Sequence, residues 1–157
     1  MLGVLIDQKF NFADHINHIN GKISKALYSL KQVKNFLGLR CRKLVYSAHV
    51  QSHLNYIAPV LAAGRVQDIN ALAAKKRKCI RIAAGAAYNA YTSTIFKELD
   101  KLPLNQLITY SIALFMLNYL AGNLPESYTG EWVLNRDQVA IQPRRNIRND
   151  NDFYIPI

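Results

Sequence analysis

The chain has 157 residues, half of them hydrophobic, with 9 Tyr and 6 Phe, which is enough to bury the core of one globular domain and excludes a disordered segment. Its two cysteines, Cys41 and Cys79, form no CxxC pair, which excludes a disulfide framework and a cysteine zinc cluster. The formal net charge of +10 is uneven, because residues 15–97 hold 14 Lys or Arg and a single acid, Asp68. Such a segment attracts polyanions, although a solubilising surface is the alternative interpretation.

The first segment, residues 1–10, contains the aliphatic run "LGVLID" (Leu2–Asp7), which predicts a short buried β-strand. No second strand-like stretch follows at hairpin distance, and a lone strand is marginally stable. We therefore expect an orphan strand that has lost its partner.

The first helix is predicted to begin at Asn11, with Asp14 at capping-box spacing, and to stop at Gly38. Hydrophobic residues recur along it at steps of three and four and predict a buried face: Ile16, Ile19, Ile23, Leu27, Leu30, Val33 and Leu37. Three cations lie off this face and are predicted to point outward: Lys22, Lys25 and Lys31. Gly21, inside the helix, indicates that another group approaches closely there.

A second helix is predicted over Leu39–Tyr56, with Leu44, Val45 and Ala48 facing the core. Its first turn holds three cations, Arg40, Arg42 and Lys43. Because cations at this end oppose the helix dipole, they favour an anionic partner. Pro59 and Gly64 indicate the loop that follows.

A third helix is predicted from an N-cap at Asp68 to a stop at Gly85, and it contains the block "KKRK". Cations at three-residue spacing line its outer side, with Arg77 adjacent: Lys75, Lys78 and Arg81. Lys76 falls near the apolar stripe, so its stem is predicted to follow the core while its ammonium reaches water. We interpret the block as a helix face that contacts nucleic-acid backbones. A solvated face, a membrane surface and a nuclear import signal are the alternatives.

The run "TSTIFKELDKLP" predicts a short helix with a Thr or Ser cap that ends before Pro103, and "LNQLITYSIALFMLNYLAG" predicts a long helix ending at Gly122. The long helix is apolar on most sides but shorter than the ~20 residues of a membrane span. It is therefore predicted to be buried, with no membrane partner. Residues 125–157 lose periodicity and predict an irregular tail.

Other chemical motifs are weak. Two histidine pairs, His15/His18 and His49/His53, have helical neighbour spacing but lack the glutamate of a zinc protease motif, so no metal site is predicted. The "NDND" run near the C-terminus has no β-strand frame for metal binding. Cys79 lies on the apolar stripe and is predicted to be a buried small side chain.

Targeting signals are also weak, because charged residues interrupt the opening "MLGVLI" before it reaches the length of a secretory signal. Together with the cysteine usage, this predicts an intracellular protein, nuclear or cytoplasmic.

Taken in order, the segments resemble the C-terminal part of reverse transcriptases of non-LTR (LINE-type) retrotransposons. The resemblance covers Leu2 to about Tyr128 and depends on the runs "LGVLID", "FADHINHINGKISKALYSLKQVKNFL", "LVYSAHVQSHLNY", "KKRKCIRI", "TSTIFKELDKLPL" and "FMLNYLAGNLPESY". It implies that residues 1–10 are the last palm strand, residues 11–124 a helical thumb-like domain and residues 125–157 a tail. The fold class is then mainly α: a bundle of about five helices after one orphan strand.

The resemblance also implies what the chain lacks. Polymerase chemistry in this family needs an aspartate pair and a third carboxylate to hold two Mg²⁺ ions. This sequence contains no Asp-Asp pair. We therefore expect no cofactor in this chain and no polymerase activity from it alone, with the Mg²⁺ ions in the palm of the parent polymerase.

The hypothesis is a C-terminal fragment of an RNA-directed DNA polymerase that binds template RNA and an RNA–DNA or DNA primer duplex. The upstream polymerase portion is a further expected partner. The expected nucleic-acid-binding residues are Lys22, Lys25, Lys31, Arg40, Arg42, Lys43, Lys75, Arg77, Lys78 and Arg81. Two alternatives stay open: a basic helical module that docks to an acidic protein through "IALFMLNYL", and a transposon remnant with no selected activity.

Overall fold

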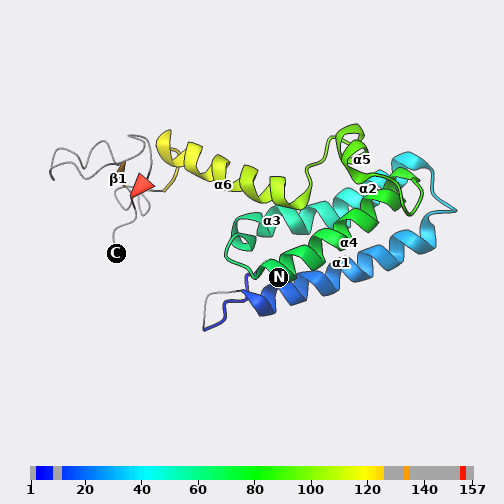
Figure 1. Cartoon of the computed structure of the whole chain (residues 1–157), viewed down its shortest axis with the longest axis horizontal. Coiled ribbons are helices and arrows are strands. Elements are labelled where there is room, and N and C mark those ends of the chain that lie inside the picture. Colours follow the sequence, from blue (N-terminus) through cyan, green and yellow to red (C-terminus); the bar gives the residue numbers. More distant parts are fainter. Residues whose placement is uncertain (1–2, 9–11, 126–132, 135–152, 155–157) are drawn as a thin grey trace. The chain divides into compact units, whose positions relative to one another are not determined.

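The structure, a computed structural model, describes residues 3–8, 12–125, 133–134 and 153–154. These residues are mainly helical, which confirms the predicted class (Figure 1). The helices are α1 (Ala13–Val33), α2 (Leu39–Tyr46), the π-helical turn η1 (Ser47–Gln51), α3 (Ser52–Leu61), α4 (Val66–Ala84), α5 (Thr92–Glu98) and α6 (Leu104–Leu120). Because α2, η1 and α3 are continuous, the described residues form five helical rods.

The chain divides into two compact units, Met1–Ile112 and Ala113–Ile157. The first unit contains α1 to α5 and the first half of α6. The second contains the rest of α6 and two short strands, β1 (Val133–Leu134) and β2 (Phe153–Tyr154), which pair antiparallel. The prediction of an irregular tail over residues 125–157 is therefore wrong for these two strands. Residues 126–132, 135–152 and 155–157, which include "NDND", lie outside the described residues.

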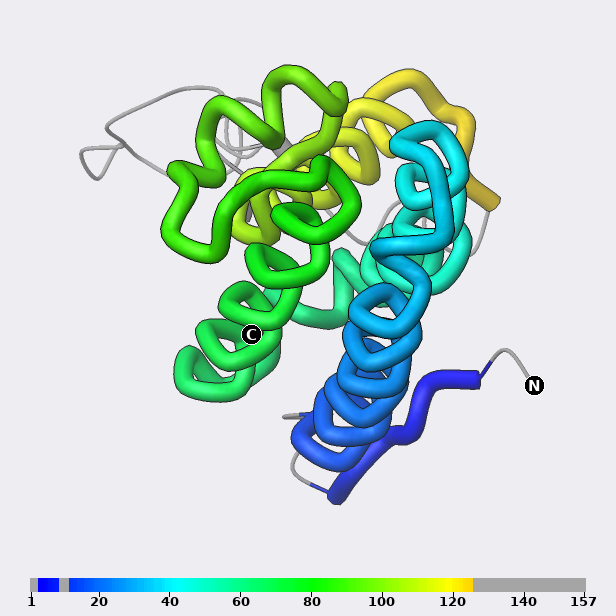
Figure 2. Tube along the Cα trace, turned by 90° about the vertical axis from the view of Figure 1, so that its right-hand side faces the viewer, coloured from blue at the N-terminus to red at the C-terminus, as the bar shows by residue number. Residues whose placement is uncertain are grey.

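The core of the first unit is organised around α4, which packs against α1, α2 and α5. Figure 2 shows α1 and α4 side by side. Their facing sides carry buried aliphatic residues at helical steps, among them Ile16, Ile23 and Leu30 in α1 and Leu72 and Ile80 in α4. Truncating a buried residue of this kind to Ala typically lowers the free energy of unfolding by about 2–5 kcal/mol. The interface with α1 therefore holds α4, which carries the "KKRK" block, in place.

The segment before α1 is not a strand: residues 3–7 have no regular secondary structure. The strand prediction is wrong for these residues, because no second strand in the described part of the chain pairs with them. The segment instead folds back onto the start of α1. The Leu5 amide donates to His15 Nδ1 (3.2 Å), and Asp7 Oδ2 accepts from the Ala13 amide (3.0 Å).

Both predicted ends of α1 differ from the structure. The predicted first residue, Asn11, lies outside the described residues, and the observed N-cap is Phe12, in the left-handed region at φ 53°. At the other end, α1 stops at Val33, and Gly38 is the extended N-cap of α2. Gly21 is exposed, and nothing lies within 4 Å of the position that a Cβ would take there, so the predicted close approach is wrong.

The continuous helix from α2 to α3 buries a face that matches the prediction only in part: Val45 is half-buried and packs against the core, as predicted, but its two predicted companions do not. Leu44 is 63% exposed and Ala48 is exposed, whereas Tyr46, Val50 and Leu54 are buried. The buried residues recur every four positions, which drifts by about 40° per step around a regular α-helix. The wider π turn at η1 absorbs this drift and keeps them on one side. The helix also continues to Leu61, so Pro59 lies inside α3 and not in a loop.

The ends of α4 are partly as predicted. Its N-cap is Arg65, and Asp68 lies in the first turn, where its charge favours the helix dipole, so the predicted cap at Asp68 is wrong. Gly85 ends the helix as predicted, at φ 72°. The Gly85 amide bonds to Ile82 O (3.1 Å) and the Ala86 amide to Arg81 O (2.9 Å), the bond pair of a Schellman motif.

The last two helices form where predicted. The N-cap of α5 is Tyr91 and not Thr or Ser. Beyond α6, Gly122 adopts φ 70°, as expected of a helix stop. The burial predicted for α6 is wrong beyond its first turn: Leu104 and Leu107 are buried, but Leu117 is 62% exposed. Within the described ranges, no helix combines the length and hydrophobicity that a membrane crossing requires.

Candidate nucleic-acid interface

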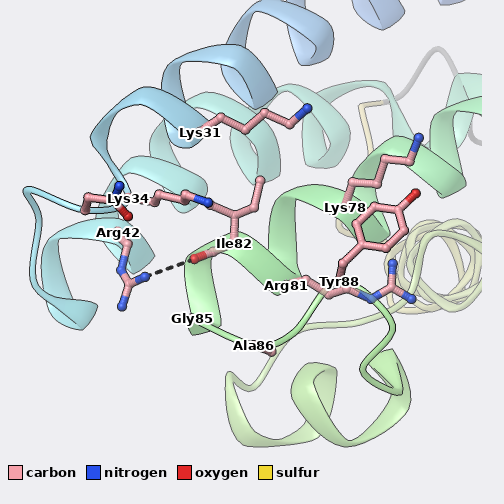
Figure 3. Close-up of a pocket in the computed structure, with 10 residues that line it drawn as sticks. Lys31, Lys34, Arg42, Lys78, Arg81, Ile82, Gly85, Ala86 and Tyr88 are labelled. Carbon is pink, nitrogen blue, oxygen red and sulfur yellow. Dashed lines mark hydrogen bonds between the residues drawn. The ribbon is translucent and has the colours of Figure 1, made fainter.

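A cleft of about 580 Å³ opens where the C-terminal end of α1, the start of α2 and the C-terminal end of α4 meet. Five cations line it, from three helices and the residue after α1, and no carboxylate does: Lys31, Lys34, Arg42, Lys78 and Arg81. The other lining residues are Asn35, Ile82, Gly85, Ala86 and Tyr88 (Figure 3). We call this cavity the cationic cleft.

Helical spacing explains how the cations come together. Lys31 and Lys34 are three residues apart at the end of α1, and Lys78 and Arg81 have the same spacing on α4. Residues at this spacing lie on one side of a helix. Because α1 packs along α4, the two pairs line the same cavity.

Arg42 reaches the cleft from α2 and contacts the end of α4. Its Nη1 donates to Ile82 O at 3.5 Å, a long bond, at the negative end of the α4 dipole (Figure 3). Gly85 leaves the space for this contact, because a Cβ there would lie 3.0 Å from Arg42 Nη2. Arg42 Nε is buried with no hydrogen-bond partner.

Most of the charge in the cleft has no internal partner. Lys31, Lys34 and Lys78 are exposed. Arg81 is half-buried and its Nε donates to the backbone oxygen of Ala90 (2.9 Å). In the part of the chain that the structure describes, none of the five cations forms an ion pair with a carboxylate. Like charges that line one cavity repel one another, and a bound polyanion would relieve that repulsion.

A second, smaller groove of about 400 Å³ runs between α1 and the helix from α2 to α3. Its polar lining includes Lys22, Lys25, His49 and His53, beside apolar residues such as Val45. Burial lowers the pKa of His53, and the positive charges of Lys22 and neighbouring histidines lower it further. The imidazole is therefore held in its neutral form at neutral pH.

The predicted binding residues divide among several places. Lys31, Arg42, Lys78 and Arg81 meet in the cationic cleft, whereas Lys22 and Lys25 line the second groove. The remaining members of the predicted set line neither cavity: Arg40, Lys43, Lys75 and Arg77.

Lys75 was predicted to face outward, but it is half-buried and joins α4 to α1. Its ammonium donates to Ser24 Oγ (2.6 Å) and lies 3.4 Å from Asn20 O. The prediction failed because a helical wheel shows one helix and not the neighbour that covers its flank.

Lys76 was predicted to reach water, and this is wrong. The Lys76 side chain is fully buried. Its Nζ donates to the Leu102 backbone oxygen (2.7 Å) and lies 5.7 Å from the centre of the Phe96 ring. Burial lowers the pKa of Lys76 to about 8, with a further contribution from Lys101. The segment between α5 and α6 passes over this side of α4 and closes the route that the ammonium would take to solvent.

Lys34 and Tyr88 are among the lining residues of the cleft that the sequence did not predict. The three-residue step from Lys31 would have found Lys34. No periodic signal exists for Tyr88, because it lies in the loop after α4.

Cys79, His15 and His18 do not line the cationic cleft. Cys79 is buried, as predicted, and burial raises the pKa of its thiol to about 12. The rings of His15 and His18 stack with centroids 6.4 Å apart. Among residues 3–8, 12–125, 133–134 and 153–154, no group of three or more His, Cys, Asp or Glu side chains is arranged to hold a metal ion.

Comparison with models of protein families, with curated proteins and with solved structures finds no match to this chain.

Proposed function

We propose that this chain is the C-terminal, thumb-like part of a LINE-type reverse transcriptase and that it holds the template and primer duplex by the phosphate backbone. The observation that carries the proposal is the cationic cleft, where five Lys and Arg side chains gather without a lining carboxylate. The order of the sequence segments, which resembles that family, supports it independently.

Backbone contact is the mode of binding that these residues favour. Lysine is a flexible point charge that suits a phosphate, and three of the five cations are exposed lysines. Contacts of this kind fix the position of a duplex without reading its sequence. We therefore expect similar affinity for duplexes of unrelated sequence.

Salt dependence tests the proposal directly. If the five cations of the cleft each neutralise one phosphate, log K should fall with log salt with a slope of about −4 to −5. A fourfold rise in salt would then weaken binding to an RNA–DNA hybrid by roughly 500-fold. Fluorescence anisotropy titrations at several salt concentrations measure this slope, and a flat response would refute the contact model.

A matched pair of variants locates the contact. Lys78 and Arg77 are adjacent and exposed on α4, but of the two it is Lys78 that lines the cleft. We expect Lys78→Ala to reduce the salt slope by about 0.9, whereas Arg77→Ala leaves it nearly unchanged. Equal effects of the two changes would mean that total charge, and not the cleft, drives binding.

Polymerisation is not part of the proposed role of this chain. The aspartate pair that would hold two Mg²⁺ ions is absent from its sequence. We propose that these carboxylates belong to a palm elsewhere in the parent polymerase. The chain alone should therefore bind primer and template without extending the primer.

A second candidate function, docking to a protein partner, is favoured by the exposed apolar side chains of α6. Ile112, Leu114 and Leu117 are each at least 40% exposed. Changing Leu114 and Leu117 to Gln tests whether α6 contributes to nucleic-acid binding. Loss of nucleic-acid binding in this double variant would favour a role for α6 that the cleft model does not include, and unchanged binding agrees with the cleft model.

A further inference from the structure

We propose that the cationic cleft receives an unpaired segment of nucleic acid at the end of the duplex, with one base stacked on the ring of Tyr88. The inference rests on the proposed function and narrows it, because it distinguishes a single-stranded extension from the paired region. It assigns a stacking role to Tyr88, an uncharged residue that the distribution of Lys and Arg does not identify.

Tyr88 is placed as a stacking platform would be. Its side chain is 81% exposed, yet it lines the cleft together with Lys78 and Arg81. Figure 3 shows the ring and the Lys78 side chain on the same side of the cavity. A large aromatic side chain that is exposed beside clustered cations leaves a free π-face next to sites for phosphate.

The loop that carries Tyr88 is fixed on both sides. Before it, Gly85 and Ala86 bond to the last turn of α4. After it, the Ala90 amide bonds to Ala87 O (3.1 Å), and Ala90 O accepts from Arg81 Nε (2.9 Å). The backbone that carries Tyr88 is thus held beside the cleft before any ligand arrives, which lowers the entropy cost of binding.

The stacking partner must be an unpaired base. Inside a duplex both faces of every base are covered by its neighbours, whereas a single strand can splay a base onto an aromatic ring. A cavity of about 580 Å³ is within the usual size range of small-ligand sites, so it can take a nucleotide. The cations would hold its flanking phosphates.

The phosphate contacts can be assigned from the unused donors. Lys31 and Lys34 approach from the end of α1 and Lys78 from α4, and in the described part of the chain none of them has an internal partner. Arg42 adds a buried Nε that has no acceptor. A phosphate near Arg42 would give that group the partner it lacks.

The test compares three fluorescent probes on the full chain by anisotropy. They are a blunt RNA–DNA hybrid, the same hybrid with an unpaired tail of about four nucleotides at either end, and a single strand alone. Tyr88→Ala should weaken binding of the tailed and single-stranded probes by about 5- to 100-fold, and leave the blunt hybrid unchanged. Tyr88→Phe, which keeps the ring, should bind like the wild type. Tyr91→Ala is the matched control, because Tyr91 is also exposed but does not line the cleft.

The outcomes separate the two levels of the proposal. If no probe binds with a salt-dependent affinity, the proposed function itself is wrong. If the blunt hybrid binds but Tyr88→Ala costs nothing on the tailed probe, the stacking inference is overturned and the backbone contact stands. Equal weakening of all three probes by Tyr88→Ala would also overturn the inference, because it would mean that the loop and not a stacked base had changed.

Discussion

Lys76 places an ammonium inside the bundle with one backbone acceptor, Leu102 O, and one aromatic ring beside it. Its pKa is lowered to about 8 by burial, so the folded chain releases this proton before the unfolded chain does. Between about pH 8 and pH 10.5 the unfolded state therefore binds more protons, and the contribution of Lys76 to stability rises with pH.

The change Lys76→Met tests this linkage, because methionine fills a similar volume without the charge. The free energy of unfolding of the wild type, relative to the variant, should increase by about 1 kcal/mol from pH 7 to pH 9. Urea denaturation at the two pH values measures the difference. A difference that does not change with pH would show that Lys76 is solvated.

Gly85 combines two roles that a matched substitution can separate. Gly85→Ala should cost roughly 1–2 kcal/mol in stability because of its positive φ, and should also displace the Arg42 guanidinium. Gly122→Ala carries the same backbone cost, but nothing lies within 4 Å of the added Cβ. We expect weaker nucleic-acid binding from Gly85→Ala alone, measured by anisotropy beside thermal unfolding. Equal losses of affinity in both would remove Gly85 and Arg42 from the cleft model.

At the scale of elements, local signals predicted where helices form better than which face they bury. The steps of three and four placed Ile16, Ile23 and Leu30 on the core side of α1, as observed. The same reasoning failed for Leu44 in α2, because the π turn at η1 changes the period and leaves no recognisable mark in the sequence. Helix ends depended on residues outside the periodic pattern. Asp7, for example, accepts from the Ala13 amide at the start of α1.

The contact between α4 and α1 predicts that Lys75 and Lys78, both in the "KKRK" block, have different roles: one in stability and the other in binding. Lys75 bonds to Ser24 across this contact, whereas Lys78 is exposed in the cleft. Lys75→Met should destabilise the fold by about 1–3 kcal/mol and change nucleic-acid affinity little at temperatures where it is folded. Lys78→Met should do the reverse. Denaturation curves and anisotropy on the two variants check both, and a binding loss confined to Lys75→Met would contradict the assignment.

At the scale of the whole molecule, composition predicted the charge imbalance but not its arrangement. Counting residues gave the excess of cations in residues 15–97. It could not show that Lys31 and Lys34 face Lys78 and Arg81 across one cleft, because that depends on how α1 packs against α4. Tyr88 was missed for a related reason, since a loop residue is placed by the helix end before it and not by any period of its own.

Protonation of histidines on acidification should lower the stability of the fold and raise its affinity for nucleic acid. Burial lowers the pKa of His15 and of His53, so the unfolded chain takes up these protons first and stability falls as pH drops through about 6.5. Protonation of His15 at Nδ1 would also break its bond from the Leu5 amide. The same protons make the molecule more positive, and His53 lies beside Lys22 in the second groove.

We therefore expect that acidification from about pH 7 to about pH 5.5 lowers the free energy of unfolding while it strengthens nucleic-acid binding. Denaturation and anisotropy at matched salt measure the two effects.

His15→Asn keeps an acceptor for the Leu5 amide but cannot titrate, so it should reduce the loss of stability and leave the gain in affinity. His53→Asn should reduce both, because this residue is half-buried and also lines the second groove. Affinity that does not change with pH in the wild type would place the second groove outside the path of the nucleic acid and leave the cationic cleft as its contact.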